Sequence, residues 1–294
     1  MRKRSDWERT VKNEHIFDEK QELERLNVQN RLFKPYEQPV YDRVLAQYKH
    51  PILLDIGSND GNKTVDRFSS GMPGRVIGLE YHDHLARQAQ AAYGDGVFSF
   101  HQCDVEAPDF PERLSALMER EGVAGFDLIH LSFVLMHLKD PGGLLRTLRR
   151  FLAPGGRLIL MEALDGGSRL SPDPVQRFRA FLDILSLDPL AGDRACGEKA
   201  PALLERCGYR DVTVEDISIC AGAEDVAKKR ALFDIFFSYL PEDIRLLQRG
   251  EPDNVRYASC GAWLAQHYDT LQNAVLSRDS ELSIGIRAIT CLGG

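Results

Sequence analysis

The segment Ile52–Gly61 constrains the fold of this chain more than any other. Its sequence, ILLDIGSNDG, is a short apolar run that ends in an acid and leads into two glycines, Gly57 and Gly61. Glycine has no Cβ and tolerates positive φ, so the backbone can turn sharply and lie close to a ligand. In open α/β sheets, such a turn at the carboxyl end of a parallel strand is a place where nucleotide-like ligands bind. We therefore expect a strand, a ligand-binding turn and a helix here.

Apolar runs of strand length alternate with helical patterns after this turn. We predict strands at 52–56, 75–80, 97–101, 126–132 and 157–162, with helices at 82–93, 110–121 and 141–152 between them. Alternation of this kind indicates a mostly parallel sheet with helices on both faces. Apolar runs at 211–220 and 282–291 add a sixth and a seventh strand. The predicted fold class is a doubly wound α/β fold with seven strands.

The remaining segments have helical patterns. Two amphipathic helices are expected between residues 18 and 48, separated at Pro35, and a helical insertion precedes the last strand. We divide the chain into an N-terminal helical cap (1–48), a ligand-binding core (49–220), the insertion (221–280) and the final strand (281–294). The insertion carries Phe233, Phe236 and Phe237 on one stripe, a pattern more typical of a core than of a pocket. The insertion itself is expected to form a substrate lid or a homodimer surface.

Composition excludes several function classes. The 294 residues carry a formal net charge of −7, which disfavours nucleic-acid binding because phosphate contacts need clustered Lys and Arg. No apolar stretch approaches the roughly 20 residues that span a bilayer, and no signal peptide is expected. The six cysteines are scattered without a CxxC pair, so neither a metal site nor a disulfide framework is predicted. We expect a cytoplasmic protein with reduced thiols.

Two common nucleotide sites fit the glycine turn poorly. A dinucleotide site requires G-x-G-x-x-G, and Asn59 stands where the second glycine belongs. A phosphate loop requires a glycine before the lysine, and Asn62 stands before Lys63. Asp60 would also place a carboxylate beside phosphate groups, which is electrostatically unfavourable. Both alternatives are therefore weak.

S-adenosylmethionine fits the residues better. A ribose needs an acid at the end of the second strand, and Glu80 ends RVIGLE. An adenine amino group needs an acceptor near the end of the third strand, where Asp104 follows Cys103. Taken together with the segments LLDIGSNDG, VIGLE, HQCDV and FDLIHLSFVLMHLKDP…FLAPGGRLILME, the chain resembles the class I SAM-dependent methyltransferases. The resemblance covers roughly residues 40–162 together with the late sixth and seventh strands, and it implies a Rossmann-like fold.

The resemblance also implies roles for individual residues. Glu80 would bind the ribose hydroxyls, and Leu131 and Ser132 would border the methionine end and the methyl group. Tyr81 would lie against the adenine, Asp104 would accept from its amino group and Val105 would line that pocket. The residues implied around the methionine part and the ribose are Asp55, Gly57, Ser58, Asn59 and Gly61.

Several assignments keep an alternative. Asp55 binds the ligand or orders the loop by accepting backbone N–H groups. Asn59 departs from the glycine of the family pattern, although asparagine tolerates left-handed backbone better than most residues. His137 is the candidate catalytic base, and a helix-flanking residue is its plainer role. The candidate substrate residues are Gln29, Arg31, Tyr36 and Phe133.

The expected activity is methyl transfer from S-adenosylmethionine, with S-adenosylhomocysteine as product, to an O, N or C atom of a small molecule. Methyl transfer from a sulfonium is an in-line displacement that needs alignment more than acid–base chemistry. A base is required only where the acceptor holds its proton, as hydroxyls do. The alternatives are a protein or peptide methyltransferase, and a SAM-binding protein without turnover.

Overall fold

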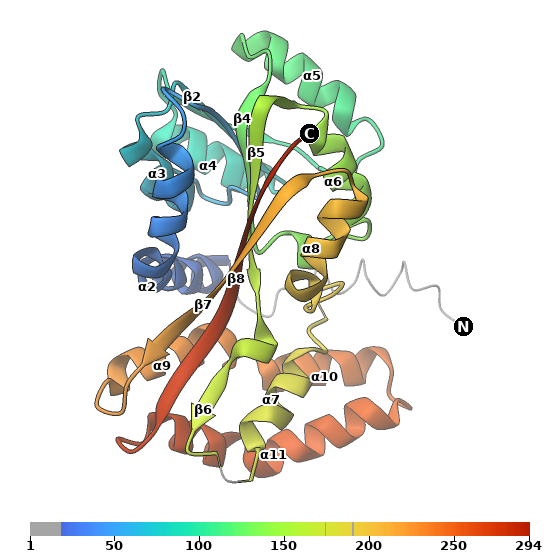
Figure 1. The fold of residues 1–294 in the computed structure, drawn as a ribbon. Helices are drawn as coiled ribbons and strands as arrows, with labels where there is room; N and C mark the ends of the chain where they lie inside the picture. The colour runs from blue at the N-terminus through green and yellow to red at the C-terminus, as the bar shows by residue number, and fades with distance from the viewer. Residues whose placement is uncertain (1–18, 174, 190) are drawn as a thin grey trace. The chain divides into compact units, whose positions relative to one another are not determined.

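The structure is a computed structural model that describes residues 19–173, 175–189 and 191–294 (Figure 1). Among the described residues, the strands are β1 (Ile52–Ile56), β2 (Arg75–Glu80), β3 (Phe98–Gln102), β4 (Phe126–Ser132), β5 (Leu152–Ala163), β6 (Arg169–Ser171), β7 (Arg210–Ala221) and β8 (Glu281–Leu292). The helices are α2 (Glu19–Leu45), α3 (Asn62–Phe68), α4 (Asp83–Tyr93), α5 (Phe110–Glu121), α6 (Pro141–Arg149), α7 (Arg177–Leu185), α8 (Cys196–Arg206), α9 (Val226–Phe236), α10 (Leu240–Gly250) and α11 (Val255–Leu276).

The described strands form one mixed sheet. Its order is β3-β2-β1-β4-β5-β8-β6, and β7 also pairs with β8. Strands β1 to β5 run parallel to one another, whereas β8 runs antiparallel to both β5 and β6. The predicted Rossmann-like α/β class is confirmed. The sequence predicted seven strands, and β6 adds a further one that is only three residues long and thus carries almost no pattern.

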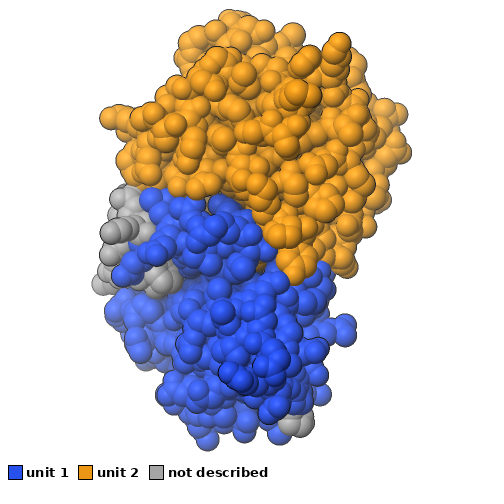
Figure 2. All heavy atoms as spheres, turned by 90° about the vertical axis from the view of Figure 1, so that its left-hand side faces the viewer, with its two compact units in different colours: residues 1–32, 164–194, 218–285 blue, residues 33–163, 195–217, 286–294 orange. Residues whose placement is uncertain are grey.

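The chain divides into two compact units (Figure 2). One unit, here the sheet unit, comprises residues 33–163, 195–217 and 286–294. The other, here the helical unit, comprises the described parts of residues 1–32 and 164–194 together with residues 218–285. Each unit is assembled from segments distant in sequence. The four segments drawn from the sequence stay a prediction.

The sheet unit has the layered build that the alternating pattern predicts. Helices α3 and α4 lie on one side of its strands, and α5, α6 and α8 lie on the other (Figure 1). Because both faces are covered, the central strands are apolar throughout: Leu53, Leu54, Leu128 and Ile129 are fully buried. The carboxyl ends of β1, β2 and β4 meet at one edge, where the loops after them build the site.

The N-terminal helix differs from the prediction. Residues 19–45 form one helix, α2, that contains Pro35 and Pro39, where the sequence predicted a break at Pro35. A proline removes one N–H group from the helical ladder, but it does not end a helix whose buried side chains hold it in place. Phe33 and Tyr41, both fully buried, lie on either side of these prolines. Packing therefore outweighs the local preference.

The helical unit has an aromatic core. Phe233 and Phe237 are fully buried, and the ring of Phe181 lies 4.9 Å from that of Phe237. Tyr268 packs edge-on against Phe233 at 5.6 Å. The phenylalanine stripe of the insertion is therefore core, as predicted.

Candidate functional site

The turn after β1 has the backbone conformation that its glycines allow. Gly57 and Gly61 have φ values of +75° and +79°. The N–H groups of Gly57 and Ser58 both donate to the carbonyl oxygen of Leu79, at 2.8 and 3.0 Å, and this ties the turn to the end of β2. A Cβ atom on Gly57 would lie 2.7 Å from Cγ2 of Val134. The close approach of the loop after β4 therefore requires glycine at position 57.

Asn59 fits the turn despite replacing a glycine of the family pattern. Its φ is +50°, a left-handed value that asparagine adopts more readily than most residues. The side-chain oxygen of Asn59 accepts a hydrogen bond from the N–H of Asp60 at 2.7 Å. The substitution keeps the left-handed turn, and the side chain stabilises the next peptide.

Glu80 joins two loops at the end of β2. Its Oε2 accepts from the N–H of Asn59 at 3.0 Å, and its Oε1 accepts from the N–H of His82 at 2.9 Å. The residue is only 6% exposed. A carboxylate offers about four acceptor positions, so each oxygen can accept a further donor such as a ribose hydroxyl.

Asp55 is held within the protein. Its Oδ2 accepts from the hydroxyl of Thr64 at 2.5 Å, and its Oδ1 lies 2.6 Å from Nδ1 of His130. Nε2 of His130 lies 2.9 Å from the Tyr41 hydroxyl. In a neutral imidazole, the proton on Nδ1 points to the carboxylate and Nε2 accepts from the tyrosine. The Asp55 carboxylate thus contacts the side chains of Thr64 and His130, whereas the loop-ordering alternative invoked backbone N–H groups. Its role towards the ligand stays a prediction.

The residues assigned to the adenine follow β2 and β3. Tyr81 is 54% exposed and packs edge-on against His82, with ring centroids 5.1 Å apart. Asp104 is half-buried and accepts from the N–H of Glu106 at 2.9 Å, and Val105 is half-buried beside it. The side chains of Tyr81 and Asp104 are therefore accessible to a ligand at this end of the sheet.

Lys63, from α3, brings to the end of β4 a polar group that the sequence analysis did not assign to the site. Nζ of Lys63 donates to Oγ of Ser132 at 2.7 Å and lies 5.5 Å from the ring centroid of Phe133. Burial lowers the pKa of Lys63, and the nearby Glu37 carboxylate opposes that shift. The sequence analysis considered Lys63 only as part of a phosphate loop. Its position two residues after Gly61, the second glycine of the turn, was the available signal.

The buried ion pair between Glu37 and Arg67 holds Lys63 in place. Oε1 of Glu37 lies 3.3 Å from Nζ of Lys63, and Oε2 of Glu37 accepts from Nε and Nη2 of Arg67 at 3.2 and 3.1 Å. The side chains of Glu37 and Arg67 are fully buried, whereas that of Lys63 keeps 16% of its exposure. Of these three side chains, that of Lys63 is thus the one that keeps solvent exposure.

The other candidate residues lie at separate places. Phe133 has a φ of +56°, and its ring packs 6.1 Å from that of Phe33. Leu131 is fully buried, and His137 is exposed at the end of a short 3-10 helix, 135–137. Tyr36 is half-buried in the sheet-unit part of α2. Gln29, buried, and Arg31, exposed, belong to the part of α2 in the helical unit.

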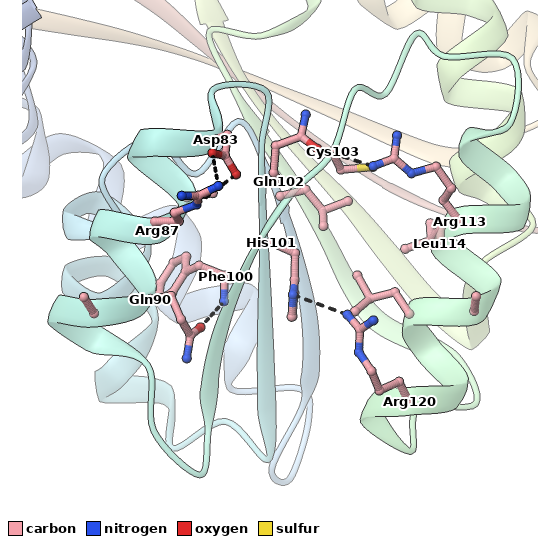
Figure 3. Close-up of a pocket in the computed structure, with 15 residues that line it drawn as sticks. Asp83, Arg87, Gln90, Phe100, His101, Gln102, Cys103, Arg113, Leu114 and Arg120 are labelled. Atoms are coloured by element: carbon pink, nitrogen blue, oxygen red, sulfur yellow. Dashed lines mark hydrogen bonds and ion pairs between the residues drawn. The ribbon is translucent and has the colours of Figure 1, made fainter.

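A groove of about 620 Å³ lies elsewhere on the sheet unit, along the outer edge of β3 between α4 and α5 (Figure 3). Phe100 and Leu114 contribute apolar surface to it, and Arg87, Arg113 and Arg120 line its sides. None of the residues assigned above to the cofactor lines this groove. This groove and the candidate cofactor site are therefore distinct.

Two further observations concern the described residues as a whole. They contain no group of three or more His, Cys, Asp or Glu side chains placed to hold a metal ion. They also contain no helix with both the length and the apolar character needed to cross a membrane.

Comparison with known proteins identifies the domain. Residues 54–158 match the model of a methyltransferase domain. The ubiquinone/menaquinone biosynthesis C-methyltransferase of Shewanella sp. strain ANA-3 is 28% identical over 116 residues, which is 37% of this chain and 41% of that protein. The Yersinia pestis bv. Antiqua enzyme of the same name is 30% identical with the same coverage. This chain thus spans about two fifths of the length of these curated relatives.

Solved structures show the same fold. A structure from Bacillus halodurans C-125 with a provisional methyltransferase assignment has a TM-score of 0.53 at 13% identity, covering 87% of this chain and 98% of that chain. The YcgJ protein of Bacillus subtilis has a TM-score of 0.51 at 18% identity, covering 86% and 97%. Residues 54–158 are thus similar to a methyltransferase domain, the curated relatives are methyltransferases, and the solved structures share the fold of this chain.

Proposed function

We propose that the protein binds S-adenosylmethionine at the turn after β1 and transfers its methyl group to a small-molecule acceptor. When bound, S-adenosylmethionine supplies an electrophilic methyl group that a nucleophilic atom of the acceptor takes by in-line displacement. The observation that carries the proposal is Glu80, whose buried carboxylate joins the turn to the start of α4 and keeps acceptor positions for hydroxyl donors. Support for a small-molecule acceptor comes from the curated relatives, which are named for quinone biosynthesis.

The residues around the turn fit a nucleoside with an amino-acid tail. Gly57 is exposed and leaves its backbone open to close approach. The hydroxyl of Ser58 is buried without a hydrogen-bond partner among the described residues, so it is ready to bind a polar ligand group. Lys63 and Ser132 would hold the amino-acid end, and Tyr81 and Asp104 the base. These roles align the cofactor, which is the main requirement of a displacement reaction.

Calorimetry with S-adenosylhomocysteine tests the cofactor assignment. Glu80→Gln removes the charge and is expected to weaken binding at least tenfold, since hydrogen bonds to charged groups contribute about 1.5–3 kcal/mol. Glu119→Gln on the exposed side of α5 is the control and should bind like the wild-type protein. The melting temperature of each unliganded variant separates lost binding from lost folding. Unchanged affinity in a folded Glu80→Gln variant would contradict the ribose assignment.

Turnover is tested separately. Methyl transfer from radiolabelled S-adenosylmethionine to a panel of small acceptors, quinols and phenols included, is expected to give labelled organic product. Labelling of a peptide panel instead would favour a protein methyltransferase. Tight cofactor binding without any labelled product would favour a binding protein without turnover.

A further inference from the structure

Asp243 occupies a core position of the helical unit. In α10, Leu240, Asp243, Ile244 and Leu247 follow the spacing of one buried helix face. Leu240 and Ile244 are each 1% exposed, and Asp243 is 2% exposed. Aspartate is among the residues least often fully buried without a partner, so its presence on this face needs a physical explanation.

Neither carboxylate oxygen of Asp243 has a hydrogen-bond partner among the described residues. Burial raises the pKa of Asp243 to about 8, and the Asp188 carboxylate adds to that shift. A buried carboxyl group without partners costs free energy unless another group satisfies it. The two carboxyl oxygens of Asp243 thus have no hydrogen-bond donor among the described residues.

The neighbouring cations are already engaged. Arg194 donates from Nε and Nη2 to the two oxygens of Asp165, at 2.8 and 3.0 Å, and its Nη1 lies 3.5 Å from Asp188. Arg194 therefore directs all three of its nitrogens to carboxyl groups other than that of Asp243. Its guanidinium offers Asp243 a nearby charge but no hydrogen bond.

Arg25 is engaged in the same way. Its Nε and Nη2 donate to Glu22 at 2.8 and 2.6 Å, and its Nη1 donates to the carbonyl oxygen of Ile235 at 2.9 Å. The guanidinium carbon lies 5.7 Å from the ring centroid of Tyr239. The charged groups that influence Asp243 are Asp188, Arg194, Glu242 and Arg25. With Asp243 itself, acidic groups outnumber the two cations, so the cluster lacks positive charge.

We infer that the helical unit contains a ligand site centred on Asp243, and that the ligand presents a protonated amine to this carboxylate. An ammonium supplies both the hydrogen-bond donors and the charge that the cluster lacks. A divalent metal would need further donor side chains, and the described residues hold no group of three. Because Asp243 is so deeply buried, the ligand is a small molecule and not a lysine side chain of a folded protein. This inference does not depend on the proposed methyl transfer.

Amine binding is tested on the full chain with benzylamine and n-butylamine as probes. Benzyl alcohol and n-butanol are the matched neutral compounds. The readout is the methyl NMR signal of Ile244, the residue next to Asp243. At pH 8.5 we expect the amines to shift this signal to saturation and the alcohols to bind at least tenfold more weakly. Equal binding of amines and alcohols, or no shift with any amine up to 100 mM, overturns the inference.

A variant pair locates the interaction. Asp243→Asn should weaken amine binding at least tenfold, whereas Asp253→Asn, an exposed residue of the same unit, should leave it unchanged. Should Asp243→Asn fail to fold, the side-chain carbon signal of Asp243 in the wild-type protein gives the same answer. Saturating amine is expected to lower the pKa of Asp243 by at least one pH unit. Unchanged amine affinity in Asp243→Asn, or an unchanged pKa, contradicts the site.

Discussion

Nζ of Lys63 lies 2.7 Å from Oγ of Ser132, which brings the first turn of α3 against the end of β4. Ser132 is assigned to the methionine end of the cofactor, and Lys63 is the part of the buried Glu37–Arg67–Lys63 cluster that keeps solvent exposure. An ammonium at this place is complementary to the carboxylate of the bound amino-acid tail. The contact between Lys63 and Ser132 therefore predicts that Lys63 affects the binding of the amino-acid tail of the cofactor and not that of its nucleoside.

Lys63→Met should weaken the binding of S-adenosylhomocysteine about tenfold, as expected for the loss of a hydrogen bond between charged groups. Binding of 5′-methylthioadenosine, which has the nucleoside but no amino-acid tail, should change less than twofold. Isothermal calorimetry measures both, with Lys49→Met, an exposed lysine, as the control. An equal loss for both ligands would mean that Lys63 acts on the whole turn and not on the tail.

Gly57→Ala tests how closely the turn after β1 approaches the loop after β4. The residue has a φ of +75°, and an added Cβ would lie 2.7 Å from Val134 Cγ2. The left-handed backbone costs about 1–2 kcal/mol for an L-residue, and the overlap adds about 1–3 kcal/mol. We expect Gly57→Ala to lower the free energy of unfolding by about 2–4 kcal/mol in urea denaturation and to weaken cofactor binding.

Two further variants separate the backbone and the overlap contributions to the destabilisation of Gly57→Ala. Gly96→Ala, where a Cβ meets nothing within 4 Å, should stay within about 0.5 kcal/mol of the wild-type protein. When Val134→Ala is combined with Gly57→Ala, the free energy lost to steric overlap should be recovered. The loss from the left-handed backbone at position 57 should remain. No recovery in the double variant would show that the overlap is relieved in another way.

The parts of the site that the sequence predicted are local in the chain. Gly57 and Gly61 mark the turn, and Glu80 is recognisable because it ends an apolar run. The parts that it did not predict depend on tertiary pairing. Asp55 and His130 face each other because β1 and β4 are neighbours in register, a relationship of two segments 75 positions apart. The pairing register of β1 and β4 cannot be predicted from a single sequence.

Other differences have the same origin. Pro35 suggested a helix boundary because proline disrupts the local ladder, yet the burial of Phe33 and Tyr41 keeps α2 continuous. Asp243 does carry a sequence signal, since it interrupts an otherwise apolar helix face. The missing donors around it became evident only when the partners of Arg25 and Arg194 were known. Local pattern thus locates candidate residues, and packing determines their partners.

The Asp55–His130–Tyr41 chain predicts a graded loss of stability. Tyr41→Phe leaves Nε2 of His130 buried without its donor, and should cost about 1–3 kcal/mol in urea denaturation. His130→Leu should cost more, about 3–5 kcal/mol, because the Asp55 carboxylate then loses its partner in the interior. Burial raises the pKa of Tyr41 well above its usual range, so its hydroxyl stays protonated through neutral pH.

The double variant and a control sharpen this test. In a His130→Leu background, Tyr41→Phe should cost less than about 1 kcal/mol, since the acceptor is already absent. Tyr48→Phe removes a hydroxyl that donates to Gly155 in an exposed contact, and should cost less than about 1 kcal/mol. Additive losses of Tyr41→Phe and His130→Leu would show that the two side chains act independently.

Asp243 makes stability depend on pH in an unusual direction. Burial raises its pKa from 3.8 to about 8 in the folded chain, with Asp188 adding to the shift. Between these values the folded state binds the proton and the unfolded state has released it, so stability falls as pH rises from about 4 to 8. The slope from this group is at most about 1.4 kcal/mol per pH unit, and it vanishes above pH 8. Urea denaturation in steps from pH 5 to 9 should show this decline in the wild-type protein and in Asp253→Asn, and a flatter profile in Asp243→Asn. Identical profiles in all three would show that Asp243 is ionised in the folded chain at neutral pH.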